Sequence, residues 1–340
     1  MKRLAFFSFF LVFVLTTGCE KNETPGLSEG NWFTQYPAHF PAPFIPADNQ
    51  PNATRIELGK ALFYDPILSI DSSISCASCH QPKHAFASLK ATNPGVYGRQ
   101  GTRNAPGLFN LAYQPHYLRE ASLPTLEMQI LVPIQEHNEF AHNIVDIGEQ
   151  LALIPYYDSL SQLAYGQAPG PYSITRSIAA FERTLISANS RYDKVSTGKS
   201  RYTPQEEEGY RLFLSSKTNC VKCHAEPFFT TFEPMNNGLY FSYKDPGRAR
   251  FTNLPTDSGK FKIPSLRNVA LTPPYMHDGS ITTLEAVIDH YASGGKSGPN
   301  QSPLVSGFTL KAEEKAALIA FLKTLSDPTF IQNQNYRLPE

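Results

Sequence analysis

Two short cysteine motifs contain the residues of this sequence best suited to chemistry. Both follow the pattern C-x-x-C-H, with cysteines and histidine at Cys76, Cys79 and His80, and again at Cys220, Cys223 and His224. In such a motif each cysteine can form a thioether with a haem vinyl group, and the histidine can ligate the iron. The alternative is a redox-active or structural cysteine pair that happens to precede a histidine, and the second copy argues against it. The sequence therefore predicts two covalently bound c-type haems.

The overall composition limits the classes of partner. The chain has 340 residues, enough for two domains, and 30 Lys and Arg residues balance 30 Asp and Glu residues. The absence of a net charge argues against a nucleic-acid partner and against a polybasic membrane surface. Four of the five cysteines belong to the two motifs, which leaves Cys19 without a partner for a disulfide.

The N-terminus has the pattern of a secretory signal. A basic start (residues 1–3) precedes an apolar run (4–15), three small residues (16–18) and Cys19. The apolar run is too short for a stable membrane span. A cysteine at the cleavage point resembles a bacterial lipoprotein signal, which would acylate Cys19, although the last leucine lies one position farther away than usual. The alternative is simple cleavage near Gly18, and in both cases we expect an exported, periplasmic protein.

Apolar spacing and capping patterns predict helices, and strand-like alternation is scarce. The expected helices cover residues 55–64, 143–161, 172–188, 206–214, 282–291 and 312–325. Thr203 and Glu206 are expected to form a capping box at the start of one of them. A helix, a haem motif and further helices occur twice in this order, so we predict an all-α fold of two cytochrome c-like haem domains.

The signal pattern, the proline-containing stretch and the repeated order of helices and motifs together predict four segments of the chain. These are a signal peptide (1–19), a proline-containing tether anchored by Trp32 (20–50), an N-terminal haem domain (51–198) and a C-terminal haem domain (199–340). The polar stretch Lys194–Arg201 marks the boundary between the two domains.

Six ordered motifs between residues 50 and 328 resemble the bacterial di-haem cytochrome c peroxidases and their MauG-type relatives. They are RNAP (103–106), LEMQ (126–129), PIQ (133–135), AAFERTL (179–185), PSLRNV (264–269) and PYMHDG (274–279). The resemblance implies that hydrogen peroxide is cleaved at the N-terminal haem, near the domain interface. Electrons would enter at the C-terminal haem from a small cytochrome c or cupredoxin. Because the family is often dimeric, the resemblance also implies a homodimer.

The resemblance assigns acid–base catalysis to Glu139 and a place in the distal pocket to Gln129, ten residues earlier. A carboxylate above the iron can move a proton from the near oxygen of peroxide to the departing one. An amide can orient the peroxide and stabilise developing charge. Two alternatives stay open, a solvated loop carboxylate at Glu139 and Glu136 as the catalytic acid.

The resemblance also implies a sixth ligand for the C-terminal iron. Family peroxidases place Met 14 residues after the histidine of a Pro-Tyr-x-His motif, and that position, counted from His277, is Tyr291, as in MauG. Tyrosinate should favour ferric iron and lower its potential relative to Met. Tyr291 could instead belong to an apolar helix stripe, and Met276 and His290 are rival ligands.

Asn104, Thr272 and Pro274 match the positions that bind an inter-haem calcium ion in the family, the last two through backbone carbonyls. Oxygen donors suit Ca²⁺, although Asn104 could simply cap a turn. One departure from the family is Arg119, which stands where a tryptophan usually relays electrons between the haems. Electrons would then need another route, such as Tyr117 or a direct propionate contact.

The sequence thus predicts a periplasmic, lipid-anchored peroxidase that reduces hydrogen peroxide to water. No histidine matches the family's resting-state ligand of the N-terminal iron, although His116 could cap it, and His84 should lie near the surface or a propionate. A MauG-like oxidase acting on a partner protein is the alternative enzyme, favoured by Tyr291 and disfavoured by Arg119. A non-catalytic electron-transfer cytochrome is the alternative from another class, and Gln129 with Glu139 argues against it.

Overall fold

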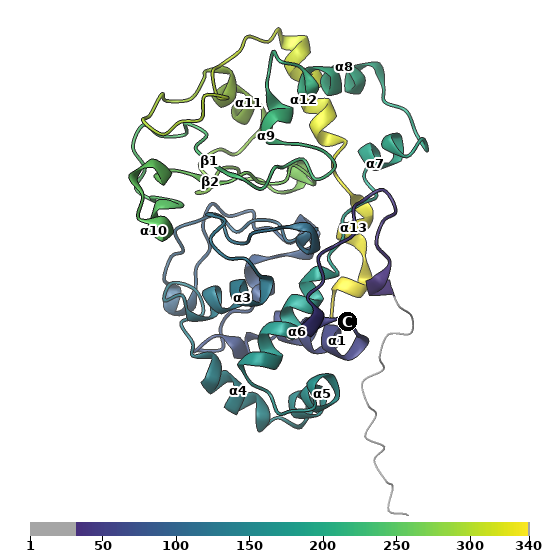
Figure 1. The fold of residues 1–340 in the computed structure, drawn as a ribbon, viewed down its shortest axis with the longest axis vertical. Helices are drawn as coiled ribbons and strands as arrows, with labels where there is room; N and C mark the ends of the chain where they lie inside the picture. The colour runs from purple at the N-terminus through teal and green to yellow at the C-terminus, as the bar shows by residue number, and fades with distance from the viewer. Residues whose placement is uncertain (1–31, 339–340) are drawn as a thin grey trace, which may run out of the picture.

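The computed structural model describes residues 32–338, which form two mainly helical lobes (Figure 1). The predicted signal peptide, Cys19 and the first part of the predicted tether lie outside these residues. The all-α prediction is confirmed, since the only sheet within residues 32–338 is a pair of two-residue strands. No helix in this range has the length and apolar character needed to cross a membrane.

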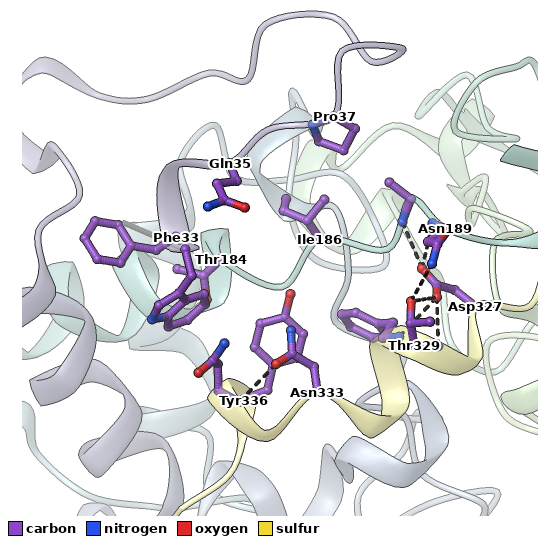
Figure 2. A pocket seen from close by; sticks show the side chains of 14 residues that line it. Phe33, Gln35, Pro37, Thr184, Ile186, Asn189, Asp327, Thr329, Asn333 and Tyr336 are labelled. Carbon is purple, nitrogen blue, oxygen red and sulfur yellow. Dashed lines mark hydrogen bonds between the residues drawn. The ribbon is translucent and has the colours of Figure 1, made fainter. Parts of the chain in front are cut away.

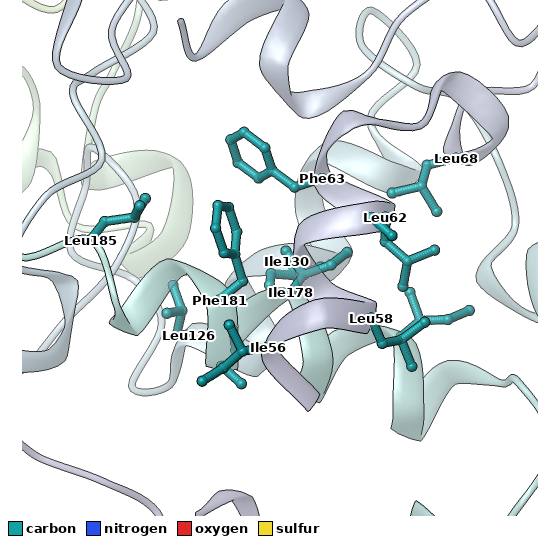
Figure 3. Close-up of a cluster of buried hydrophobic side chains, with 14 of the residues drawn as sticks. Ile56, Leu58, Leu62, Phe63, Leu68, Leu126, Ile130, Ile178, Phe181 and Leu185 are labelled. Carbon is teal, nitrogen blue, oxygen red and sulfur yellow. The ribbon is translucent and has the colours of Figure 1, made fainter. Parts of the chain in front are cut away.

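The N-terminal lobe is built around two crossing helices, α1 and α6. Its helices are α1 (Ala53–Tyr64), α2 (Cys76–Cys79), α3 (Leu126–Gln135), α4 (Ile144–Ala152), α5 (Pro155–Tyr165) and α6 (Pro171–Arg183). Leu62, Phe63 and Phe181 are fully buried where α1 meets α6 (Figure 3). A Cβ on Gly59 would lie 1.8 Å from the carbonyl oxygen of Ser177, so this close crossing requires glycine.

The C-terminal lobe has a similar close helix crossing, between α8 and α12. It contains α7 (Arg191–Ser196), α8 (Pro204–Leu214), α9 (Cys220–Cys223), α10 (Ala249–Thr252), α11 (Leu284–Ala292), α12 (Ala312–Lys323) and the antiparallel strands β1 (Pro234–Met235) and β2 (Phe261–Lys262). The rings of Phe213 and Phe321 lie 5.2 Å apart in the core of this lobe. A Cβ on Gly209 would lie 1.9 Å from the carbonyl oxygen of Ala317. In both lobes, a glycine-bearing helix therefore precedes the C-x-x-C-H motif and crosses a later helix closely.

The last segment of the chain returns to the N-terminal lobe. After α12 comes α13 (Pro328–Gln332), and Phe330 and Tyr336 are buried in the N-terminal core although they lie within the predicted 199–340 domain. The Trp32 ring lies edge-on to Tyr336, with ring centroids 5.9 Å apart. A cavity of about 420 Å³ lies at this junction, with Gln35 and Asp327 in its lining (Figure 2). The two ends of the described chain therefore meet on one lobe.

Short 3₁₀ helices connect these elements. They are η1 (Trp32–Thr34), η2 (Ala47–Asn49), η3 (Pro66–Leu68), η4 (Pro82–His84), η5 (Val96–Gly98), η6 (Leu111–Tyr113), η7 (Pro255–Asp257), η8 (Val269–Leu271) and η9 (Gln334–Tyr336).

Local signals predicted some helix boundaries and missed others. The capping box at α8 is confirmed, because the Thr203 hydroxyl accepts from the Glu206 backbone N–H while the Glu206 carboxylate accepts from the Thr203 N–H. The single helix predicted over 143–161 is wrong, since α4 ends before Ile154 and α5 begins at Pro155. Proline lacks the N–H that a continuous helix needs, and it favours a first-turn position. The helix expected over 282–291 is α11, which is capped by the Thr283 side chain and begins at Leu284.

Candidate active site

The histidines of the two motifs are held in the same tautomer. His80 follows α2, and its Nδ1–H donates to the carbonyl oxygens of Phe86 at 2.8 Å and Pro106 at 3.0 Å. His224 follows α9, and its Nδ1–H donates to the carbonyl oxygen of Phe229 at 3.0 Å. Because a carbonyl can only accept, each Nδ1 carries the proton and each Nε2 keeps its lone pair. Such second-partner bonds orient histidine ligands of metals.

The four motif cysteines are free thiols placed in pairs on single helical turns. Burial raises the pKa of Cys79 and that of Cys220 to about 11. The side chains of Cys76 and Cys220 pack against the hydrophobic core of their own lobe. Two thiols one turn apart, beside a histidine with an available Nε2, fit a covalently attached haem in each lobe.

Glu139 lies in the turn that follows α3, folded back against that helix. Its N–H donates to the carbonyl oxygen of Glu136 at 2.9 Å, and its own carbonyl accepts from Val96 at 3.0 Å. A Cβ on Gly95 would lie 2.1 Å from the Asn138 carbonyl oxygen, so the chain approaches this turn very closely. The backbone of the predicted acid is therefore fixed on both sides.

The Glu139 carboxyl is exposed, and its charge acts on the first haem motif. Partial desolvation by the surrounding protein raises its pKa, Glu136 raises it further, and Arg103 opposes the shift. The Glu139 carboxylate in turn raises the pKa of Cys79, which places the two groups within electrostatic reach. Its rival Glu136 instead lies 4.0 Å from the guanidinium of Arg250 on the other lobe. The geometry thus favours Glu139 over Glu136 as the carboxyl beside the first motif.

Gln129 lies on α3, a helix that the sequence analysis did not predict. Thr125 caps this helix by accepting from the Met128 N–H at 3.2 Å. The neighbouring Glu127 anchors α3 on α6 through an ion pair of 2.7 Å with buried Arg183. Gln129 is half-buried, and its side-chain amide makes no hydrogen bond to other residues in the range 32–338. Its donors are therefore not used within the described part of the protein.

Tyr291 faces the second motif from α11. Burial raises its pKa to about 12, with Cys223 and Cys220 among the smaller causes, and its hydroxyl is hydrogen-bonded to the Asn237 side chain. Leu284 and Ile288 belong to the core of this lobe, whereas Tyr291 does not. Core packing therefore explains the positions of Leu284 and Ile288 on α11, but it does not explain that of Tyr291.

The two rivals of Tyr291 are both tied to Asn237, a residue that the sequence analysis missed. His290 donates from Nε2 to the Asn237 carbonyl oxygen at 3.0 Å. The Met276 sulfur accepts from the Asn237 side-chain amide at 3.2 Å. Met235 on β1 was also missed, and its sulfur lies 3.8 Å from the Cys223 sulfur. No sequence spacing connects Asn237 or Met235 to α11.

Glu182 on α6 is a further acid that the sequence analysis quoted only as part of a motif. It is 5% exposed, and its Oε2 has no hydrogen-bond partner among the described residues. Burial raises its pKa to about 8, and its charge acts on Cys76. With this pKa, the Glu182 carboxyl is neutral over much of the physiological pH range.

At the junction of the lobes, Arg119 binds Asn104. The Arg119 guanidinium donates to the Asn104 side-chain oxygen at 2.7 Å and to its carbonyl oxygen at 2.8 and 3.2 Å. The Asn104 N–H donates across the junction to the His277 carbonyl oxygen at 2.8 Å. Asn104 is thus a link between the lobes and not a simple turn cap.

This arrangement does not fit the predicted calcium site. A calcium ion on the Asn104 side-chain oxygen would lie about 4 Å from the guanidinium nitrogen that already binds that oxygen. At an effective dielectric constant of about 20, the repulsion would be roughly 8 kcal/mol. The other predicted ligands, Thr272 and Pro274, would add only neutral carbonyl oxygens, which do not offset this repulsion.

The remaining predicted residues lie away from these contacts. His116 is exposed, and its carbonyl accepts from the Lys262 ammonium at 2.9 Å. Burial lowers the pKa of His84, at the end of η4. Tyr117 is buried, and its hydroxyl donates to the Leu111 carbonyl oxygen at 3.0 Å. This hydrogen bond stays within the N-terminal lobe. A cleft of about 800 Å³ near the junction includes His277 in its lining.

Comparison with known proteins gives a consistent assignment. A family profile described as di-haem cytochrome c peroxidase matches residues 53–201, and one described as cytochrome c matches residues 206–326. The methylamine utilization protein MauG of Methylorubrum extorquens is 33% identical over 285 residues, covering 82% of this chain and 80% of the relative. The cytochrome c551 peroxidase of Nitrosomonas europaea is 34% identical over 297 residues, covering 85% of each chain. The crystal structure of a MauG-like protein associated with microbial copper homeostasis superposes with a TM-score of 0.83 at 32% identity, covering 89% of this chain and 98% of that one.

Proposed function

The chain belongs to the family of di-haem cytochrome c peroxidases and MauG proteins, and from this premise we propose that it reduces hydrogen peroxide to water. Two electrons and two protons convert one peroxide to two water molecules. A small cytochrome c or cupredoxin would supply the electrons, one from each of two donor molecules. Cys76, Cys79 and His80 would hold the peroxidatic haem, and the second motif would hold the haem that receives electrons.

The placement of Glu139 supports this proposal most strongly. It gives the first motif, and not the second, a solvent-exposed carboxyl with a raised pKa. In its ionised form, Glu139 can accept a proton from one oxygen of the peroxide. It can then release this proton to the departing oxygen, which leaves as water. A raised pKa brings the carboxyl closer to the pH at which it must both accept and donate.

The other residues near the first motif orient the reactants. The Gln129 amide, with its donors available, can hold the peroxide and stabilise the charge that develops on the departing oxygen. His80 would ligate the iron through Nε2, with its ring fixed by two carbonyl oxygens. When bound, the haem supplies the redox-active iron at which the O–O bond is broken. General acid–base catalysis by a group such as Glu139 typically contributes about 10²- to 10⁴-fold.

At the second motif, we propose that Tyr291 is the sixth ligand of the iron. Its half-buried phenol is hydrogen-bonded to the Asn237 side chain and lies within electrostatic reach of both motif cysteines. His290 and Met276 also contact Asn237, so these bonds do not separate the three candidates. The preference for Tyr291 rests on its electrostatic reach to both motif cysteines and on the position that the family resemblance assigns to it. An anionic oxygen ligand would close this iron to peroxide and lower its reduction potential.

A MauG-like oxidation of a partner protein is the second candidate function. Tyr291 favours it, because MauG has tyrosine at the corresponding position, and the similarity to MauG and to a MauG-like protein supports it. Arg119 disfavours it, since an arginine guanidinium cannot be oxidised as a relay between the haems. Steady-state peroxide consumption by the haem-loaded protein with reduced cytochrome c separates the two. Sustained turnover supports the peroxidase, and a long-lived oxidised state without turnover supports the partner-protein oxidase.

The cellular setting of the peroxidase completes the proposal. We propose that the protein works in the periplasm, held at a membrane only by a lipid on Cys19, and that it forms a homodimer. The support is the signal pattern of residues 1–19, the attachment chemistry of c-type haem and the family resemblance. Fractionation of cells producing wild type or Cys19→Ser tests the anchor, because only the wild type should sediment with membranes. Light scattering of the purified protein tests the dimer.

A further inference from the structure

We propose that the guanidinium of Arg119 takes the place of a divalent cation between the two lobes, so that this protein holds its haem lobes together without calcium. The proposal rests on two contacts of Asn104. Its side-chain oxygen accepts from the Arg119 guanidinium, and its backbone N–H donates to the His277 carbonyl oxygen of the other lobe. This inference concerns the architecture of the junction and does not depend on which reaction the haems catalyse.

The hydrogen bonds of Asn104 use all of its polar groups. Its side-chain N–H donates to the Lys90 carbonyl oxygen at 3.0 Å, so its side-chain oxygen must face Arg119. The guanidinium binds this oxygen at 2.7 Å and the Asn104 carbonyl oxygen at 2.8 Å. One cation therefore bridges two oxygens of the same buried residue, which is a role that metal ions also fill. Both oxygens of Asn104 therefore already have a cationic partner.

Both partners of this pair are bonded to the C-terminal lobe. The Asn104 N–H donates to the His277 carbonyl oxygen at 2.8 Å, and the Arg119 carbonyl accepts from the Lys262 N–H at 2.6 Å. Lys262 lies on β2, and His277 follows it in the same lobe. The guanidinium is thus at the centre of a connection that enters the other lobe at two separate points.

The charge at the junction leaves no demand for a further cation. Arg103 is already paired with Glu120 and with Asp245, at 2.6 Å from the latter. Arg119 keeps its charge at neutral pH, because burial and Arg103 lower its pKa only to about 10 while Asp278 opposes the shift. Burial, then Arg119, lowers the pKa of Lys262 to about 7. Within this shift only the Arg119 contribution is a repulsion between cations, and a divalent ion at Asn104 would meet the same guanidinium charge.

Metal analysis of the purified, haem-loaded wild type tests the proposal directly. After dialysis against calcium-containing buffer and then metal-free buffer, we expect no stoichiometric calcium. The thermal midpoint and the ferric haem spectrum should be the same with EGTA and with millimolar CaCl₂. One bound calcium ion per chain, or a thermal midpoint that falls in EGTA, would overturn the proposal.

Variants test whether Arg119 itself makes the connection. Arg119→Gln should lower the thermal midpoint by several degrees, because it removes a charge-assisted contact between the lobes. Arg211→Gln is the matched control, since Arg211 is exposed and paired only with Glu208 on its own helix. A thermal midpoint for Arg119→Gln equal to that of the control would contradict the assignment. If Arg119→Gln does not fold, the calcium analysis of the wild type still decides.

Discussion

The two lobes carry the same haem-attachment motif and differ in the side chain that we propose to face each haem. In each, a short helix presents two thiols, and a histidine is fixed by a backbone carbonyl. The N-terminal lobe adds a carboxyl, Glu139, whereas the C-terminal lobe adds a half-buried phenol, Tyr291. A carboxyl can exchange protons with a small substrate, and a phenol can close an iron to that substrate as a ligand. We therefore expect the two lobes to differ in function through these facing side chains and not through the motifs themselves.

The largest expected effect comes from removing the acid of the N-terminal lobe. Glu139→Gln should lower kcat for peroxide reduction by about 10²- to 10⁴-fold, because the amide cannot relay the proton. The matched control is Glu136→Gln, three residues away and directed at Arg250, which should stay near wild type. Steady-state kinetics with reduced cytochrome c provide the measurement. If the control loses as much activity as Glu139→Gln, the acid has been assigned to the wrong residue.

A smaller loss should follow from removing the amide of the same lobe. Gln129→Leu should lower kcat/KM by roughly tenfold to hundredfold, corresponding to the loss of a hydrogen bond to a charged group of about 1.5–3 kcal/mol. Gln135→Leu is the control, since Gln135 is exposed on the same helix. Equal rates for the two variants would show that α3 contributes no side chain to the reaction.

The pH profile should report the acid of the N-terminal lobe. Glu139 must be ionised to accept the first proton, so kcat/KM should fall about tenfold per pH unit below its pKa. Since its pKa is raised, this fall should begin at a higher pH than for an ordinary glutamate, whose pKa is about 4.3. The acid limb should be absent from the profile of Glu139→Gln. An unchanged limb in that variant would assign the titration to another group.

The smallest effect on turnover, but a distinct spectroscopic one, is expected in the C-terminal lobe. Tyr291→Phe should change the optical spectrum of one haem and raise its reduction potential, because an anionic oxygen ligand is lost. Tyr243→Phe is the control, as the Tyr243 hydroxyl also contacts Asn237. Spectra and potentials of Tyr291→Phe that match those of wild type would make Tyr291 a packing residue.

Sequence reasoning recovered the features that local spacing encodes. The two motifs, the capping box of Thr203 and Glu206 and the all-α fold follow from short-range patterns. Helix α3 was missed, since Pro133 within it lacks the N–H of a regular helix. The contacts of Asn237 and the bond between Arg119 and Asn104 were missed because they join residues distant in sequence. The calcium site expected from family positions stays a prediction, and the bond between Arg119 and Asn104 is the observation from which we propose the alternative.

Optical titration of the ferric, haem-loaded protein with cyanide tests the division between the lobes most directly. Cyanide binds an iron with an exchangeable sixth position, and mass spectrometry of the same sample counts the covalently attached haems. We expect two haems per chain and one equivalent of cyanide bound, with binding confined to the lobe of Glu139. Two equivalents bound, none bound, or fewer than two attached haems would contradict it.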